Sequence, residues 1–569
     1  MQNSKPLIIQ GDRSILLDVH DPKANEARFA LIPFAELEKS PEHIHTYRIT
    51  AMSLWNAAGA GIKPEHIIQT LTEFSRFEVP SSVLSWMNET ITRYGKIKLC
   101  PVQISSTETE DNFSQDFLCL KTENKIIYEE VKNLKPLSKY ISEDIQNENS
   151  FLLNILNRGT VKQLLLKQGW PVQDEVPLQD GEAFEINLKN STSTGKTFEI
   201  RNYQKDAADA FVGNKSAGTG FGTIVLPCGS GKTVVGMIVM SMLKTNTIIL
   251  TPNVAAVYQW KRELLDKTDI QEDDIGLYTG EAKEIKPITI ATYQVLTWRP
   301  STDAPFPHFK IFKERNWGLI IYDEVHLLPA PVFRITAELQ IIRRLGLTAT
   351  LVREDGCEGD VFSLVGPKRF DVPWKDLEQK GWIAKAHCTE IRVNMDTKKE
   401  IEYAVASSRQ KYRLASENAE KIKIVKKLLE KHKEQQILII GQYISQLQII
   451  AQEVNAPIIT GKNTNIERES LYDSFRKGEI NVLVVSKVAN FAIDIPDASV
   501  AIQISGAFGS RQEEAQRLGR ILRPKECDSN FYTIITRQSV EEEFAEKRQK
   551  FLAEQGYDYN ILTESEIVF

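Results

Sequence analysis

The chain has 569 residues, of which 42% are hydrophobic, and it carries a formal net charge of −6; this length favours about four domains. No apolar run reaches the roughly 18 residues of a membrane-spanning helix, and Met1–Gln10 lacks the apolar core of a signal peptide, so the composition excludes a helical membrane protein and predicts no membrane partner. The six cysteines show no Cys-x-x-Cys spacing, which excludes common zinc and iron–sulfur patterns and predicts reduced thiols in a cytoplasmic protein.

The first 195 residues carry no catalytic motif. Residues 45–61, 64–74 and 80–94 have the apolar spacing of amphipathic helices, and residues 95–100 have that of a strand. Three helices followed by a strand predict a winged-helix-like module over residues 1–115. A packing or protein-interaction domain explains the same pattern, and the sequence leaves both interpretations open. After the polar segment 103–113, residues 116–195 are expected to form a small α+β domain.

From residue 196 onward, short β-branched runs alternate with helical stretches, which is the pattern of parallel sheets with crossover helices. In residues 196–371, strands are expected at 223–226, 247–250, 288–292, 319–322 and 344–348. In residues 372–569, they are expected at 436–440, 457–460, 482–485, 500–504 and 531–535. The predicted fold class is therefore α/β, with two parallel-sheet lobes.

A glycine-rich turn joins the first of these strands to a helix-prone stretch. The turn reads Gly229-Ser230-Gly231-Lys232-Thr233, and such a loop points backbone N–H groups and a helix N-terminus at a bound anion. Lys232 is expected to reach the β- and γ-phosphates of ATP, and the Thr233 hydroxyl to ligate Mg²⁺. The strict phosphate-loop pattern has glycine where this chain has Leu226.

Two adjacent carboxylates follow the apolar strand that ends at Tyr322. Ligands bind at this end of the strands in doubly wound sheets. Asp323 is placed to hold Mg²⁺ through water, and Glu324 to orient and deprotonate the attacking water. His326 either couples this site to the second lobe or is a structural histidine.

Near the end of the chain, Gln516, Arg520 and Arg523 have the spacing i, i+4 and i+7, which sets them on one helical face. A guanidinium supplied to a γ-phosphate from a second lobe is an arginine finger. Arg520 and Arg523 are the finger candidates, with Gln516 beside them. The sequence thus predicts an ATP cleft between the two lobes.

Three long motifs identify a family. The stretches 322–334, which includes Asp-Glu-Val-His, 345–356 and 509–524 resemble those of XPB-type helicases of superfamily 2, most closely the bacterial members, and the resemblance covers nearly all of the chain. It implies two RecA-like lobes preceded by an N-terminal mixed α+β region. By position, residues 116–195 match the damage-recognition domain of that family. A thumb-like insertion is also known near the start of the second lobe, but the segment here is short.

The resemblance assigns further residues. It implies that Gln204 recognises adenine, that Asp494 senses the ribose and nucleotide, and that Thr348 and Thr350 form the coupling motif of the first lobe. It links Arg353, Glu354 and Asp355 to strand separation. The implied DNA contacts also include Thr251, Arg262, Thr292, Thr460 and Lys487.

The function that the resemblance implies is an ATP-dependent 3'-5' DNA helicase in DNA repair. It would use ATP and Mg²⁺, act on single strands and duplex junctions, and work as a cytoplasmic, nucleoid-associated monomer. The acidic net charge does not oppose this, because the local field of a groove governs DNA binding. Two alternatives stay open: a translocase on duplex DNA, and an ATP-gated DNA-binding switch that recruits a nuclease.

Overall fold

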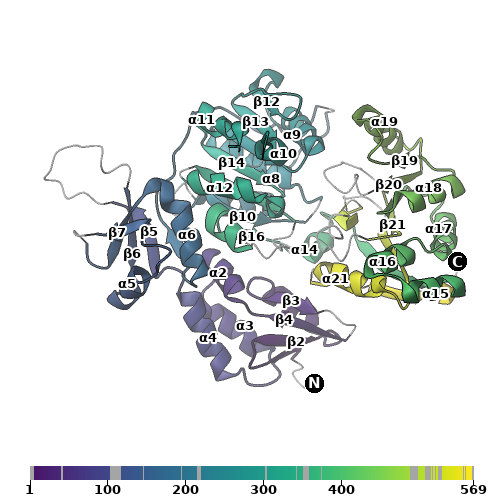
Figure 1. Cartoon of the computed structure of the whole chain (residues 1–569), viewed down its shortest axis with the longest axis horizontal. Coiled ribbons are helices and arrows are strands. Elements are labelled where there is room, and N and C mark those ends of the chain that lie inside the picture. Colours follow the sequence, from purple (N-terminus) through teal and green to yellow (C-terminus); the bar gives the residue numbers. More distant parts are fainter. Residues whose placement is uncertain are drawn as a thin grey trace. The chain divides into compact units, whose positions relative to one another are not determined.

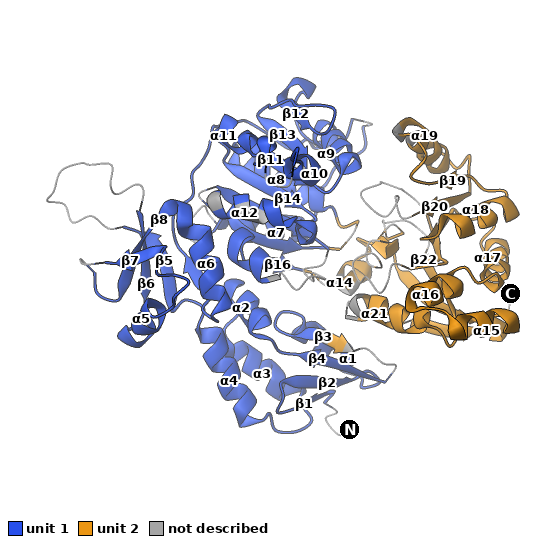
Figure 2. Cartoon of the chain, viewed as in Figure 1, with its two compact units in different colours: residues 1–36, 41–226, 231–371 blue, residues 37–40, 227–230, 372–569 orange. Residues whose placement is uncertain are grey.

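The computed structural model describes residues 5–39, 43–102, 117–144, 147–193, 195–213, 219–227, 229–301, 304–340, 342–349, 358–372, 374–486, 498–506, 514, 517–519, 521–522, 528–554, 557 and 559–566 (Figure 1). The chain divides into two compact units (Figure 2). The first comprises residues 1–36, 41–226 and 231–371, and the second comprises residues 37–40, 227–230 and 372–569.

The N-terminal region combines an antiparallel sheet with helices. The sheet has the order β1-β2-β4-β3. The elements are β1 (Leu7–Ile9), β2 (Ser14–Asp18), α1 (Ala24–Leu31), β3 (Glu36–Lys39), β4 (Ile44–Arg48), α2 (Ala51–Gly59), α3 (Pro64–Phe74) and α4 (Ser81–Thr92). The helices expected at 64–74 and 80–94 are confirmed by α3 and α4.

The expected helix over 45–61 is wrong in its first part. Residues 44–48 form β4, which pairs antiparallel with β2 from Ser14↔Arg48 onward. His45 and Tyr47 are buried between more exposed neighbours, so the apolar period here is the strand period of 2 rather than 3.6. The helix begins only after Thr50, whose hydroxyl accepts a hydrogen bond from the Ser53 N–H as an N-cap.

A second sheet has the order β7-β8-β6-β5-β9. Its elements are β5 (Ile97–Pro101), β6 (Phe117–Thr122), α5 (Lys125–Lys132), β7 (Ile141–Glu143), β8 (Ser150–Asn154), α6 (Arg158–Lys167) and β9 (Val172–Asp174). The strand expected at 95–100 therefore exists, but its assignment to the helical module is wrong, because β5 pairs with β6 and β9. Ile97 and Leu99 complete the apolar core of this sheet, together with Leu120 and Leu153.

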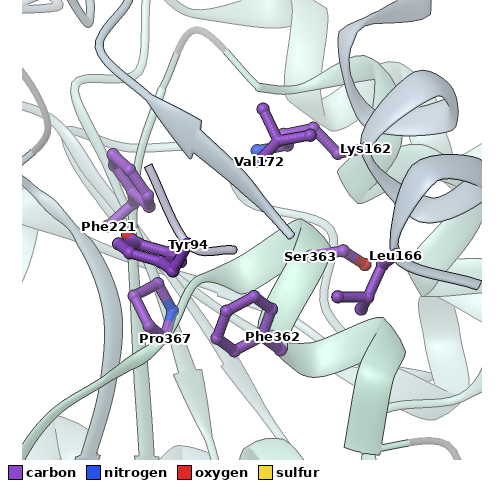
Figure 3. Close-up of a pocket in the computed structure, with 8 residues that line it drawn as sticks. All are labelled: Tyr94, Lys162, Leu166, Val172, Phe221, Phe362, Ser363 and Pro367. Atoms are coloured by element: carbon purple, nitrogen blue, oxygen red, sulfur yellow. The ribbon is translucent and has the colours of Figure 1, made fainter. Parts of the chain in front are cut away.

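Helix α6 joins this sheet to the first parallel-sheet lobe. A Cβ at Gly159 would lie 2.5 Å from the Ala337 Cα, so α6 approaches helix α12 (Ala330–Glu338) closely enough to require glycine. Beside this contact, Tyr94, Lys162, Phe221 and Pro367 line a small pocket where all three parts of the unit meet (Figure 3). The N-terminal region, the second sheet and the first lobe are therefore packed together.

The first lobe is built on a parallel sheet with the order β12-β13-β11-β14-β15-β10-β16. The strands are β10 (Phe221–Val225), β11 (Thr247–Thr251), β12 (Ile275–Tyr278), β13 (Ile288–Thr292), β14 (Leu319–Asp323), β15 (Arg343–Thr348) and β16 (Lys368–Asp371). The helices are α7 (Asn202–Val212), α8 (Lys232–Leu243), α9 (Val254–Lys267), α10 (Tyr293–Thr297), α11 (Ile311–Glu314), α12 and α13 (Glu358–Asp360). All strands expected in this lobe are confirmed, and β12 and β16 extend the sheet at its edges.

The second unit is built on another parallel sheet, with the order β19-β20-β18-β21-β22-β17-β23. The strands are β17 (Ala386–Val393), β18 (Ile437–Gly441), β19 (Ile458–Ile459), β20 (Val482–Ser486), β21 (Val500–Gln503), β22 (Ser529–Thr536) and β23 (Tyr559–Thr563). The helices are α14 (Trp374–Gln379), α15 (Thr397–Val405), α16 (Ser408–Ser416), α17 (Glu420–Lys431), α18 (Ile444–Glu453), α19 (Asn465–Arg476) and α21 (Val540–Glu554). The expected strands are again confirmed, whereas β17 and β23 were not foreseen. Within the part of the chain that the structure describes, no helix could cross a lipid bilayer.

A buried ionic cluster fixes α6 on its own sheet. The Asp174 carboxylate accepts hydrogen bonds from Arg158 Nε and Nη2, at 2.9 and 2.8 Å, and from Lys162 Nζ at 2.9 Å. Arg158, Lys162 and Asp174 are each less than 5% exposed. The charges of Arg158 and Lys162 lower the pKa of Asp174 against the opposing effect of burial. Asp174 is therefore ionised and neutralises buried cations.

Asp174→Ala is expected to destabilise the protein by about 3–5 kcal/mol, because it leaves two buried cations without a counter-charge. The measurement is chemical denaturation followed by intrinsic tryptophan fluorescence. Glu143→Ala, which removes the exposed Lys132–Glu143 pair from the same sheet, serves as the control and is expected to unfold like the wild type. Equal stability of Asp174→Ala and the control would show that the cluster contributes nothing.

Candidate active site

The candidate site lies at the carboxyl ends of the strands of the first parallel sheet. Strand β15 lies between β10 and β14, and all three are parallel. Their carboxyl ends therefore bring together the glycine-rich loop, the Asp323-Glu324 pair and Thr348. The Leu226 N–H donates to the Thr348 carbonyl over 3.0 Å, which ties the start of the loop to the end of β15.

The glycine-rich loop has the backbone of an anion-binding turn. Gly229 and Gly231 have φ angles of 79° and 85°, a region that costs glycine little and other residues more. Gly231 is the N-cap of α8, and Lys232 and Thr233 occupy its first turn. A helix N-terminus presents unpaired N–H groups and a partial positive charge to an anion. This arrangement is suited to a phosphate group.

Gln204 lies beside this loop. Its side chain is 4% exposed, and its Oε1 accepts a hydrogen bond from the Arg201 N–H at 3.0 Å. A Cβ at Gly231 would lie 2.5 Å from Gln204 Nε2, so this amide approaches the loop closely, while the φ of 85° is what favours glycine at position 231. Gln204 thus lies near the phosphate loop; its role in adenine recognition stays a prediction.

Asp323 is held by two aromatic side chains. The Trp260 indole N–H donates to Asp323 Oδ2 at 2.9 Å, and the Tyr293 hydroxyl donates to the Asp323 carbonyl at 2.9 Å. Burial and the neighbouring charge of Glu324 raise the pKa of Asp323 to about 6. The Trp260 indole therefore orients the Asp323 carboxylate, and the raised pKa shows that nearby positive charge does not fully stabilise its ionised form.

Glu324 adopts an unusual backbone conformation, with φ at 49° and ψ at 55°. Strained residues of this kind persist where the surroundings impose them, often at functional sites. Glu324 Oε1 lies 3.6 Å from Lys232 Nζ, and Oε2 lies 3.5 Å from His326 Nδ1. Burial alone would raise the pKa of Glu324, but the charges of Lys232 and then His326 lower it overall.

These side chains fit a divalent cation. Two carboxylates in a largely buried site face the Lys232 ammonium, with His326 beside Glu324, and a divalent cation would add positive charge to this pair. Among the residues that the structure describes, no donor makes a hydrogen bond to Glu324 Oε2. Oxygen ligands of this kind suit Mg²⁺, which proteins commonly bind through one or two carboxylates together with substrate phosphates.

His326 connects the carboxylates to the end of β15. It is 5% exposed, and its Nδ1 lies 2.7 Å from the Thr348 hydroxyl. Glu324, His326 and Thr348 thus form a continuous chain of polar contacts. Both contacts of His326 lie within the first lobe, so its role in coupling to the second lobe stays a prediction. Thr350 lies outside the described residues.

The residues expected to contact DNA differ in their exposure to solvent. Thr251 and Thr292 are buried, and their hydroxyls bond within the fold: Thr251 donates to the Ala291 carbonyl, and Thr292 accepts from the Val295 N–H as an N-cap. Their side chains therefore do not face solvent, so DNA contacts at these two positions would have to come from neighbouring main chain. Arg262 is exposed on α9, whereas Thr460 is 7% exposed after β19.

Several expected site residues lie outside the described part of the chain. They are Gln516, Arg520 and Arg523 of the finger motif, Asp494 of the nucleotide sensor, and the DNA candidates Arg353, Glu354, Asp355 and Lys487. Their roles remain predictions.

Sequence inspection missed the role of Trp260 and Tyr293. Trp260 stands next to Lys261 and Arg262, and this neighbourhood indicates a nucleic-acid surface, yet Trp260 is only 1% exposed. The sequence around a tryptophan in a charged helix does not predict which residue its indole N–H will bind. Only the packing of α9 against the sheet reveals the contact with Asp323.

Comparisons with known proteins match nearly the whole chain to helicases and a related restriction-enzyme subunit. A family model described as the ERCC3/RAD25/XPB C-terminal helicase matches residues 377–568, one for the type III restriction enzyme res subunit matches 197–353, and one for a helicase conserved C-terminal domain matches 7–138. The "DNA 3'-5' helicase XPB" of Mycobacterium tuberculosis is 49% identical over 98% of this chain and 97% of its own length. The protein of the same name from Kineococcus radiotolerans is 48% identical over 99% and 97%. The Saccharomyces cerevisiae "General transcription and DNA repair factor IIH helicase/translocase subunit XPB/SSL2" is 31% identical over 98% and 72%.

Glu324→Gln is expected to retain Mg²⁺-ATP binding and to lower the rate of hydrolysis by about a hundredfold or more, because the amide cannot accept the proton of the attacking water. Binding is measured with a fluorescent nucleotide and hydrolysis by phosphate release. Glu314→Gln, a change at a distant, partly exposed glutamate of the same lobe, is the control. Wild-type turnover in Glu324→Gln would remove this residue from its role.

Trp260→Phe is expected to raise the Mg²⁺ concentration needed for half-maximal ATP hydrolysis by about tenfold, because Asp323 loses the donor that orients it. The matched control is Trp317→Phe, since Trp317 is also buried in this lobe but donates to the Ile311 carbonyl instead. An equal shift of the Mg²⁺ requirement in both variants would assign the effect to general packing.

Proposed function

The chain belongs to the XPB family of DNA helicases, and from this premise we propose how its residues drive the ATP-dependent 3'-5' helicase activity of that family. The observation that carries the proposal is the arrangement at one sheet edge: a glycine-rich loop with Lys232, and two carboxylates within reach of it. A family member with near-full-length similarity and this arrangement is an ATP-dependent DNA helicase.

The first lobe binds the nucleotide and prepares the water. The backbone N–H groups at the start of α8 and the Lys232 ammonium hold the β- and γ-phosphates. When the Lys232 ammonium pairs with the phosphates of ATP instead of with Glu324, the Glu324 carboxylate can accept the proton of the attacking water. Thr233 and Asp323 would hold Mg²⁺, which supplies positive charge to the phosphate oxygens when bound. Gln204 contacts the adenine.

The second lobe contributes the remaining positive charge. Arg520 and Arg523 serve as fingers that stabilise charge on the transferred phosphoryl group, with Gln516 beside them, and Asp494 senses the ribose. Two observations support these assignments. The motif matches that of the family, and it follows strand β21 of the second parallel sheet in the chain. Hydrolysis removes the γ-phosphate, so the arginines lose their ligand and the closed arrangement of the two lobes is released.

DNA is moved by contacts to its backbone. Arg262, Lys487 and the loops at Thr251, Thr292 and Thr460 are the proposed contacts, and such sequence-independent contacts suit a motor that must pass any sequence. Arg353, Glu354 and Asp355 are proposed to part the strands. The coupling chain from Glu324 through His326 to Thr348 carries the state of the nucleotide toward this segment.

Strand separation in DNA repair is favoured over the alternatives. Two bacterial relatives with nearly half of their residues identical to this chain are named DNA 3'-5' helicases, and the more distant eukaryotic relative is named a helicase/translocase subunit of a DNA repair factor. Translocation on duplex DNA is the second candidate, because the eukaryotic name includes it, whereas these names give no support to a switch that recruits a nuclease. We further propose that one chain suffices for activity, because every motif lies within it.

The protein is expected to displace a strand from a duplex with a 3' single-stranded tail and not from one with a 5' tail, because movement is 3' to 5' on the loaded strand. The measurement is release of a fluorescent strand in the presence of ATP and Mg²⁺, with Glu324→Gln as the inactive control. DNA-stimulated ATP hydrolysis without displacement from either duplex would point to the duplex translocase instead.

A further inference from the structure

An exposed tryptophan lies on the first lobe, next to its buried apolar core. Trp298 directly follows α10 and is 55% exposed. Two residues earlier, Leu296 is buried in the core of the lobe together with Ile311 and Phe312. The tryptophan is therefore attached to a well-packed core, while about half of its side chain remains in contact with water.

His308 and Tyr278 place a second ring beside this indole. The centroids of the Trp298 and His308 rings are 5.8 Å apart. His308 Nδ1 lies 2.9 Å from the hydroxyl of Tyr278, which is 2% exposed at the end of β12. Burial and the charges of Lys283 and Lys310 lower the pKa of His308. At pH 7 His308 is therefore a neutral ring, which Tyr278 holds next to the exposed indole.

Positive side chains surround these rings. The Arg299 guanidinium is exposed and lies over the Phe306 ring, with its Cζ 5.0 Å from the ring centroid. A guanidinium stacked in this way keeps N–H groups in its own plane that can bind a phosphate. Lys283 and Lys310 are exposed as well. The aromatic–cationic patch thus defined consists of Trp298, Arg299, Phe306 and His308, with Lys283 and Lys310 beside them.

Acidic side chains also lie near the patch. Lys310 Nζ is 3.6 Å from Glu314 Oε1, and Glu281 and Glu284 are exposed in the segment that carries Lys283. Exposed ion pairs contribute little to stability, so a ligand phosphate can replace Glu314 as the partner of Lys310. Because the acidic groups oppose a purely ionic contact, stacking on Trp298 is expected to contribute more to binding than charge.

The patch follows directly from the end of the sheet that carries proposed DNA contacts. Thr292 ends β13 and is the N-cap of α10, which runs from Tyr293 to Thr297. A helical rise of 1.5 Å per residue places Trp298 about 9 Å from Thr292. A DNA strand held by the main chain near Thr292 would therefore be within reach of the indole.

We propose that Trp298 is a stacking platform for an unpaired DNA base, and that Arg299, Lys283 and Lys310 bind phosphates of the same strand. The inference rests on the proposed function and deepens it by adding a site for single-stranded DNA. A single exposed apolar side chain needs no function, but aromatic rings combined with cations are what proteins use to bind single strands. Such stacking tolerates any base, whereas the bases of a duplex are already stacked on each other.

The test is Trp298→Ala in the full chain, with the binding of a fluorescently labelled oligothymidylate measured by anisotropy in the absence of nucleotide. We expect the dissociation constant to rise by about fivefold or more, because the stacking of one base is lost. Binding of a blunt-ended duplex should stay at its wild-type value. Trp298→Phe keeps an aromatic ring, so its affinity for the oligothymidylate should stay within about threefold of wild type.

The matched control is Phe77→Ala. Phe77 is 64% exposed in the N-terminal region, so this change also removes an exposed aromatic ring. Wild-type affinity for the oligothymidylate is the expected result. An equal loss of affinity in Phe77→Ala and Trp298→Ala would overturn the proposal, and so would a loss in Trp298→Ala that is as large for the duplex as for the single strand.

Arg299→Gln tests the phosphate contact. This change should weaken binding of the oligothymidylate and reduce the slope of log affinity against log salt concentration by about 0.7, the value for one phosphate contact on a single strand. An unchanged slope would overturn the role of Arg299.

Failure of this site and failure of the proposed function give different results. Wild-type affinity of Trp298→Ala for the oligothymidylate, together with ATP-dependent strand displacement by the wild type, would overturn the platform and leave the proposed function intact. A patch that serves a protein partner would give this result. A wild-type protein that neither binds the oligothymidylate nor hydrolyses ATP would overturn both.

Discussion

The ion pair between Lys232 and Glu324 is the interaction around which the first lobe is organised. Lys232 begins helix α8 after the glycine turn, and Glu324 leaves strand β14 in a left-handed conformation that is costly for a glutamate. Their charges meet at 3.6 Å beside Asp323, whose pKa is raised to about 6 by burial and by Glu324. The site thus holds two neighbouring carboxylates, whose negative charge a divalent cation would help to neutralise.

The topology of the sheet makes this meeting unavoidable. β10 and β14 are far apart in the sequence, but both flank β15 in a parallel arrangement, so their carboxyl ends share one edge. The same edge receives Trp260 from α9 and His326 from the turn after β14. The residues proposed to hold a phosphate, a cation and a water are therefore adjacent without any long loop to carry them.

Buried polar clusters orient a helix in both units. In the first, Arg158 and Lys162 of α6 share the carboxylate of Asp174; in the second, Gln503 and Arg548 share that of Glu514. Such clusters contribute less to stability than apolar packing of the same volume would. The directional bonds to Asp174 set how α6 is rotated, which matters for its docking against Ala337.

The sequence by itself determined the two parallel sheets, the phosphate loop and the carboxylate pair, because these depend on local signals: β-branched runs, a glycine turn and charges at a strand end. It misplaced residues 44–48, where a strand period of 2 continues directly into a capped helix, and it assigned β5 to the wrong sheet, because strand pairing depends on partners distant in the chain. The family resemblance also implied DNA contacts at Thr251 and Thr292. Only the tertiary structure decided that these hydroxyls are buried, that Trp260 orients Asp323, and that Gln503 bridges Glu514 and Arg517, since each contact joins segments whose proximity no local pattern encodes.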